Sequence, residues 1–347
     1  MERGEPKGSL FASCKETACG GDGEKTRRLC IKCDDRARFC RNLLLYYKKN
    51  EGGKQMASFV THFLNVMFRH MPIIEDTQEE RRKNAARPLP KPPKGVTVGD
   101  AGLSVPCELV EKQGNGDIFV LNIHGGGFTT GSAKETRALS FYLCDKLGYN
   151  VLACDYRLAP EHKLPAAFED CFDVYRAVIK KYPRLIVLGG SAGGALAIGI
   201  VQRAMRAHLP LPLAVAAFSP VAGIGMDLPS HKANIKTDYM LKRDPSGGKL
   251  LAKLVPAGAG EDFLKDPSIS PVYGEFRGFP PLFLSVSDSE VLYDDSKLLY
   301  EKAKTAGVKC KLEIGHKQLH AWASIPQIPE SHQTLQNMKT FFDEAVR

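Results

Sequence analysis

Short apolar runs alternate with helix-like stretches along most of the chain. Five runs of four to six residues, each bounded by Gly, Pro, Asp or Ser, are typical of buried strands, and they span 118–123, 151–154, 185–188, 213–218 and 282–286. Between some of them, Ala166–Lys181 and Ala192–Arg206 show helical spacing of apolar residues. Strands and helices that alternate in this way favour a largely parallel sheet covered on both faces. The pattern therefore predicts an α/β fold.

A separate amphipathic helix is predicted near the N-terminus, over residues 56–71. Phe59, Phe63 and Met67 recur at four-residue spacing, and a second apolar row follows one position later. Such a helix either packs on the body of the protein or forms a lid over a pocket. The proline-rich segment 88–93 cannot continue a helix. We therefore expect a basic, cysteine-containing arm with cap helices over residues 1–94 and a folded body over 95–347.

Charge is concentrated in the arm. The 347 residues have a formal net charge of +9, but residues 1–95 carry 20 Lys and Arg against 12 Asp and Glu, whereas 96–347 carry 28 against 27. A basic chain suggests an anionic partner. The body is close to neutral, and the arm lacks the mixture of basic and aromatic residues that is typical of nucleic-acid binding. We therefore expect no nucleic-acid partner.

The N-terminus and the cysteines indicate the compartment. The first residues are charged and have no apolar core of a secretory signal, and no run reaches the length of a membrane span. We therefore expect a cytoplasmic protein with reduced thiols and no stable membrane insertion. Cys30 and Cys33, with Cys14 and Cys19, have spacings that zinc sites use. The ten residues between the two pairs are a short interval, so small, partly buried thiols are favoured and no metal is expected.

The segment from 187 to 194 has the spacing of a nucleophile elbow. Gly189-x-Ser191-x-Gly193 leaves a predicted strand and enters a helix rich in small residues. Such a turn exposes the serine hydroxyl, and it needs glycine because helix and strand backbones approach closely. Although five-residue patterns of this kind occur by chance, the strand–turn–helix context is the one that the motif requires.

Three successive glycines follow the predicted strand 118–123. Gly125, Gly126 and Gly127 can present backbone N–H groups to a cavity without obstruction by Cβ atoms, and with the N–H of Ala192 they would form an oxyanion hole. A phosphate-binding loop would have a different glycine fingerprint or a following Gly-Lys-Ser/Thr. His124, which precedes the glycines, is interpreted as a structural histidine that fixes this loop.

Five segments in order make the chain similar to the hormone-sensitive-lipase-like branch of the α/β-hydrolases, a family of carboxylesterases. They are 124–128, 155–162, 189–194, 266–271 with 280–295, and 320–322. The resemblance covers about residues 95–347. It implies an α/β-hydrolase fold with an N-terminal helical cap, in which 56–71 and 222–260 cover the pocket. It also implies small to medium acyl esters as substrates and no cofactor.

The resemblance also bears on the acid and the base, which follow the serine in the order acid then histidine. The family pattern places the acid at Glu290, where most relatives have Asp, and Asp288 is the competitor. His320, followed by Ala-Trp, matches the family's histidine better than His316 does. Gly190, where relatives often carry Asp, is a second departure. Asp294 and Asp295 are expected to cap or support the following helix.

The sequence therefore predicts a serine carboxylesterase with Ser191, Glu290 and His320 as its triad, acting on a small-molecule ester. One alternative is a non-catalytic receptor on the same fold, although receptors of this kind have lost the histidine. Another is a deacetylase or lactonase acting on a specific natural product. A role in lipid metabolism fits the resemblance, and a homodimer is left open.

Overall fold

The computed structural model describes residues 57–70, 88–241 and 248–345. All of these lie in one compact unit, which spans Gln55–Arg347. The cysteine pairs considered as a zinc site, Cys14 with Cys19 and Cys30 with Cys33, lie outside the described residues.

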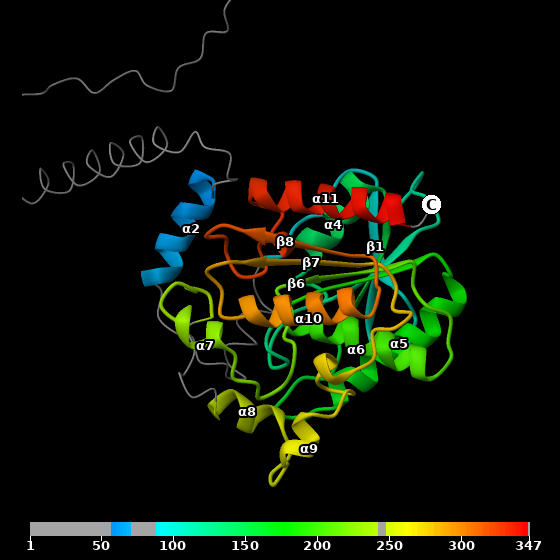
Figure 1. The fold of residues 1–347 in the computed structure, drawn as a ribbon. Helices are drawn as coiled ribbons and strands as arrows, with labels where there is room; N and C mark the ends of the chain where they lie inside the picture. Colours follow the sequence, from blue (N-terminus) through cyan, green and yellow to red (C-terminus); the bar gives the residue numbers. More distant parts are fainter. Residues whose placement is uncertain (1–56, 71–87, 242–247, 346–347) are drawn as a thin grey trace, which may run out of the picture. The chain divides into compact units, whose positions relative to one another are not determined.

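The described residues form one sheet of eight strands in the order β1-β2-β4-β3-β5-β6-β7-β8 (Figure 1). Their bounds are β1 Val96–Asp100, β2 Cys107–Lys112, β3 Phe119–Ile123, β4 Asn150–Cys154, β5 Leu185–Gly190, β6 Ala214–Phe218, β7 Leu282–Ser287 and β8 Cys310–Gly315. Strand β2 is antiparallel to both of its neighbours, β1 and β4, and the pairs from β4 to β8 are parallel. The α/β fold with a mostly parallel sheet is confirmed.

Burial explains which strands the apolar pattern revealed. Every residue of β3 to β7 is buried, so these strands appear in the sequence as predominantly apolar runs. Strands β1, β2 and β8 lie at or near the sheet edges and are only partly buried. Their mixed composition carries no such run, and the sequence analysis did not predict them.

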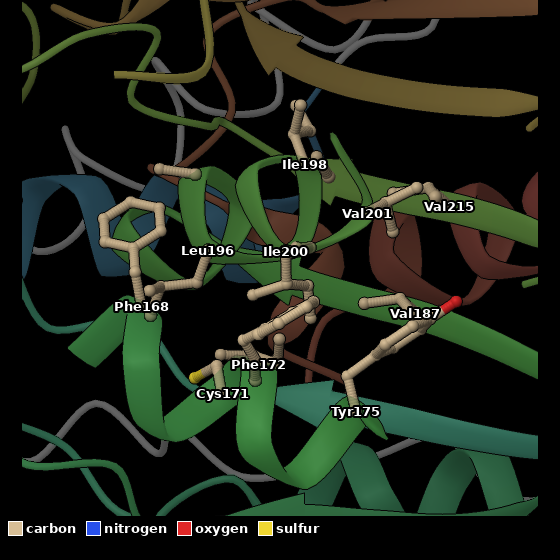
Figure 2. Close-up of a cluster of buried hydrophobic side chains, with 14 of the residues drawn as sticks. Phe168, Cys171, Phe172, Tyr175, Val187, Leu196, Ile198, Ile200, Val201 and Val215 are labelled. Atoms are coloured by element: carbon tan, nitrogen blue, oxygen red, sulfur yellow. The ribbon is translucent and has the colours of Figure 1, made fainter. Parts of the chain in front are cut away.

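Helices cover both faces of the sheet and divide the core in two. Helices α4 (Arg137–Leu147) and α11 (Pro329–Ala345) pack on one face, and α5 (Ala166–Lys181), α6 (Ala192–Arg206) and α10 (Tyr293–Thr305) pack on the other (Figure 1). Figure 2 shows the second layer, where side chains of α5 meet α6 and the strands β5 and β6. Each large apolar side chain buried there contributes about 1.5–3 kcal/mol. Helix α6 is thereby fixed with its N-terminus at the end of β5.

Helix α2 (Phe59–His70) packs on the body rather than standing apart from it. Ser58 and Thr61 donate hydrogen bonds to the carboxylate of Glu330 in α11, and Thr61 is buried. Leu64 and Phe68 pack against a small cluster that contains Trp322. Four other apolar side chains of the helix, Phe59, Val60, Phe63 and Met67, are exposed.

Short helices connect β6 to β7 on the α5–α6 side of the sheet. They are α7 (Pro229–Ala233), α8 (Gly248–Leu254), α9 (Glu261–Leu264) and the 3₁₀ turn Pro271–Tyr273. The ammonium of Lys163 donates to the carbonyls of Ala252 and Val255, as expected for a cation at a helix C-terminus. These bonds fix α8 to the segment that precedes α5.

Candidate active site

Ser191 lies on a strained turn between β5 and α6. Its φ of 56° and ψ of −122° are rare for a non-glycine residue, and such conformations cost roughly 1–3 kcal/mol and cluster at functional sites. A Cβ on Gly189 would collide with the backbone of Gly193, and a Cβ on Gly193 would collide with the carbonyl of Ile123. The glycines of the motif are therefore required by backbone contact, as the strand–turn–helix interpretation predicts.

The glycine loop after β3 lies directly against this turn. A Cβ on Gly125 would come within 2.8 Å of the Gly190 carbonyl oxygen and 3.3 Å of the Ser191 Cβ. Gly126 and Gly127 have φ of 109° and 60°, which glycine adopts without strain. Within the described residues, no oxygen accepts a hydrogen bond from the N–H groups of 125–127. These donors, which are partly exposed, are available to bind an anion next to Ser191.

The side chain of His124 holds the glycine loop in place, as the sequence predicts. Its Nδ1 lies 2.7 Å from the Gly125 carbonyl oxygen, which makes this nitrogen the donor. The ring stacks on Tyr156 at a centroid distance of 4.1 Å, and the Tyr156 hydroxyl donates to the His124 carbonyl at 2.9 Å. Burial lowers the pKa of His124 to about 4, so the imidazole is neutral at physiological pH.

This histidine predicts a specific pH dependence of stability. In the unfolded chain it takes up a proton near pH 6.5, but in the folded protein only near pH 4. The stability that it contributes is therefore present above about pH 6.5 and is lost as the pH falls toward 4. Replacing His124 by Gln should reduce the loss of unfolding free energy between pH 7 and 5 by about 2 kcal/mol.

Urea titrations of the wild type and His124→Gln at the two pH values measure this difference. The exposed His332 gives a control variant, His332→Gln, which shows what loss of a surface histidine alone does to the pH dependence. Equal pH dependence in His124→Gln and the wild type would show that the buried imidazole is not protonated on unfolding.

The two candidate acids pair with different histidines. Glu290 Oε2 lies 2.5 Å from His320 Nδ1, and both side chains are buried. Asp288 Oδ2 lies 2.6 Å from His316 Nδ1, and these side chains remain 37% and 43% exposed. Only the first pair is shielded from water, where a carboxylate can orient an imidazole and stabilise its charged form most strongly. The geometry thus favours Glu290 and His320 as one unit and Asp288 and His316 as a surface ion pair.

The Glu290 carboxylate is buried among hydrogen-bond donors. Its Oε1 accepts from the Ser287 N–H at 2.7 Å and from the Ser219 hydroxyl at 2.9 Å, while Oε2 faces His320. Burial raises the pKa of Glu290, the charge of Asp238 raises it further, and His320 opposes the shift. Three donors around one carboxylate hold it in a single orientation.

The histidine loop also abuts the elbow. A Cβ on Gly190 would lie 2.7 Å from the Ser324 Oγ and 3.7 Å from the Ala321 Cβ, so the residue after His320 lies beside the residue before Ser191. A larger side chain at position 190 would displace Ser324. The Ser324 hydroxyl therefore occupies the space beside Gly190.

Sequence reasoning missed the residues that hold the acid loop. Asn234 donates to the carbonyls of Asp288 and Glu290, and Asp238 accepts from the Val291 N–H at 3.0 Å. Asp238, Glu290 and His320 lie close enough to hold a metal ion. However, both Asp238 oxygens already accept from backbone N–H groups, and Glu290 faces His320 Nδ1, so this donor set is that of a hydrogen-bonded network.

Asp294 and Asp295 support α10 from its first turn, where their charge complements the helix dipole, but neither of them caps it. Helix α10 has no side-chain cap, and both aspartates lie in its first turn. Asp295 instead accepts from the Ala222 N–H at 2.9 Å and lies 2.6 Å from His231 Nε2, while Asp294 accepts from the Ser230 N–H. They fix the segment after β6 because the fold brings it against α10, which no local pattern indicates.

None of the helices in the described part of the chain is both long and apolar enough to cross a bilayer.

Comparison with known proteins places the chain in a family. Residues 120–324 match the family described as alpha/beta hydrolase fold. An acetyl-hydrolase from Streptomyces hygroscopicus is 32% identical over 73% of this chain and 85% of its own length. An esterase from Acinetobacter venetianus is 30% identical over 67% of this chain and 77% of its own length. The crystal structure of a hormone-sensitive lipase from a metagenome library superposes with a TM-score of 0.75 at 26% identity, over 84% of this chain and 100% of that one. The chain therefore belongs to the α/β-hydrolase fold family and is a carboxylesterase of its hormone-sensitive-lipase-like branch.

Proposed function

We propose that the protein hydrolyses esters through Ser191, His320 and Glu290. The Ser191 hydroxyl attacks the ester carbonyl carbon while His320 takes its proton, and the alcohol then leaves with that proton. Water activated by His320 attacks the acyl-enzyme, which releases the carboxylic acid and restores the serine. Glu290 holds the Nδ1–H tautomer of the imidazole and stabilises the imidazolium. The observation that carries the proposal is the buried 2.5 Å contact between Glu290 and His320 beside the strained Ser191.

The oxyanion is assigned to the glycine loop and the start of α6. The N–H groups of Gly126, Gly127 and Ala192, with Gly125 beside them, would donate to the tetrahedral intermediate. Two facts support this assignment: the loop packs against Ser191, and its N–H groups have no acceptor within the described residues. His124 keeps the loop in place by its bond to the Gly125 carbonyl.

Small to medium acyl esters are the proposed substrates. In α8, Leu250 Cδ1 would lie 4.0 Å from a Cβ placed on Gly127, which is van der Waals distance. An apolar side chain therefore borders the oxyanion loop. The name of the acetyl-hydrolase relative points to short acyl groups in that protein. The near-neutral body is compatible with an uncharged substrate.

A series of p-nitrophenyl esters from acetate to dodecanoate tests the proposal. We expect kcat/KM to be highest for acyl chains of two to about eight carbons and to fall for longer ones, because Leu250 borders the oxyanion loop and limits the room for a long chain. A maximum at twelve carbons would contradict the substrate range. Failure to hydrolyse any member of the series would contradict the esterase proposal and favour a receptor or an enzyme restricted to one natural product.

A further inference from the structure

One short segment at the end of β6, Phe218 and Ser219, contacts all three parts of the proposed triad. The Phe218 carbonyl accepts from the Ser191 N–H at 2.7 Å, which anchors the elbow. The next residue, Ser219, donates its hydroxyl to Glu290 Oε1 at 2.9 Å and accepts from the Ala321 N–H at 3.1 Å. Ser219 therefore joins the acid to the backbone of the histidine loop, while its neighbour holds the nucleophile.

Ser219 adopts a conformation that serves these contacts. Its φ is 46°, and it is fully buried. Ser191 and Ala321, the other two residues whose N–H groups bond to this segment, have φ of 56° and 49°. Left-handed backbone at a non-glycine residue costs free energy and persists where surrounding contacts determine it. Three such residues meeting at one point indicate that the chain tolerates strain here to fix a geometry.

The backbone of Ser219 is held independently of its hydroxyl. Its N–H donates to the Ser285 carbonyl in β7 at 2.7 Å, which continues the β6–β7 pairing. The hydroxyl is therefore presented from a rigid position toward a carboxylate that cannot move into water. The Ser287 N–H donates to the same Glu290 oxygen, so Ser219 does not supply its only hydrogen bond. Its hydroxyl adds a second contact, which sets the rotation of the carboxylate plane.

We propose that Ser219 is a positioning residue for ester hydrolysis, whose hydroxyl aligns the Glu290 carboxylate with the imidazole of His320 by bridging it to the backbone amide of Ala321. This inference rests on the proposed function, since it requires Glu290 and His320 to act on the ester. Ser219 does not touch the substrate. It acts through Glu290, so its loss should affect the rate of the chemical step and leave substrate binding unchanged.

Two variants and one control separate the hydroxyl from the backbone. Ser219→Ala and Ser219→Gly both remove the hydroxyl, and glycine also relieves the left-handed strain. Both should lower kcat by roughly 10- to 100-fold with KM within about twofold, as expected for a lost hydrogen bond to a charged group. Ser285→Ala is the matched control, because its buried hydroxyl has no partner within the described residues. It should retain wild-type kcat.

A double-mutant cycle with Glu290→Gln tests whether Ser219 acts through the acid. We expect Ser219→Ala to have less than a twofold effect on the residual kcat of Glu290→Gln, because its target is already lost. An equal loss in both backgrounds, or wild-type kcat in Ser219→Gly, would overturn the inference. If Ser191→Ala retained activity instead, the proposed function itself would fail, so the two failures are distinguishable.

Discussion

Replacing Ser191 by alanine is expected to lower kcat for p-nitrophenyl butyrate by roughly 10⁴- to 10⁶-fold. The variant cannot form an acyl-enzyme, and the oxyanion donors alone give little acceleration. The backbone at this position is held by the hydrogen bond from its N–H to Phe218 and by the glycine contacts around it, so the turn should persist. Steady-state turnover at pH 8, with background hydrolysis subtracted, measures the effect.

Two controls show whether such a loss comes from chemistry. Thermal unfolding of Ser191→Ala should lie within a few degrees of the wild type, since only one oxygen is removed. Ser285→Ala removes the hydroxyl of a fully buried serine and should turn over normally. Turnover of Ser191→Ala within tenfold of the wild type would place the nucleophile elsewhere.

Replacing Glu290 by glutamine should lower kcat by about 10⁴-fold, whereas Asp288→Asn should stay within about threefold of the wild type. The glutamine carbonyl can still accept from Ser219 and Ser287, which turns its NH₂ group toward His320 Nδ1. The imidazole must then carry its proton on Nε2, and it cannot accept one from Ser191. Asp288 pairs with His316 at a partly exposed site. Replacing it by asparagine therefore leaves the Nδ1–H tautomer of His320 intact.

The stability of these variants distinguishes a lost function from a lost fold. Burial raises the pKa of Glu290, so the stability tied to this carboxyl is present below its ordinary pKa and declines as the pH rises through the raised value. Glutamine removes a buried charge, and Glu290→Gln should therefore be at least as stable as the wild type at pH 7. A full loss of activity in Asp288→Asn, with Glu290→Gln active, would reverse the assignment of the acid.

The sequence predicted the centre of the sheet and missed its edges. Strands β3 to β7 are buried on both faces, so their residues are mostly apolar, with a few buried polar residues such as Asn122 and Ser285. Strand β8 is only partly buried and exposes Lys311 and Ile314, and its lysine and glutamate interrupt any apolar pattern. Helices α5 and α6 were predicted with their observed bounds because one face of each is apolar over three or more turns.

The site was predictable where its chemistry is local in sequence. Ser191 and Gly125–Gly127 stand in motifs whose spacing reflects backbone contacts, so a few residues suffice to find them. The resemblance favoured Glu290 over Asp288 from the family register, whereas the histidine that each acid meets, about 30 residues away, is seen only in the fold. Ser219 meets Glu290 across 71 positions and Ala321 across 102. No local pattern encodes contacts of that range, which arise only when β6 and β7 pair.

Covalent labelling with diethyl p-nitrophenyl phosphate tests the central claim most directly. Attack by an activated serine on the phosphorus releases p-nitrophenol and leaves a diethylphosphoryl group on the serine oxygen. We predict one such group per chain, located at Ser191 by peptide mass spectrometry, with loss of ester hydrolysis in proportion to labelling and no label on Ser191→Ala. A label on another residue, or hydrolysis that survives complete labelling of Ser191, would contradict a mechanism in which this serine is the nucleophile.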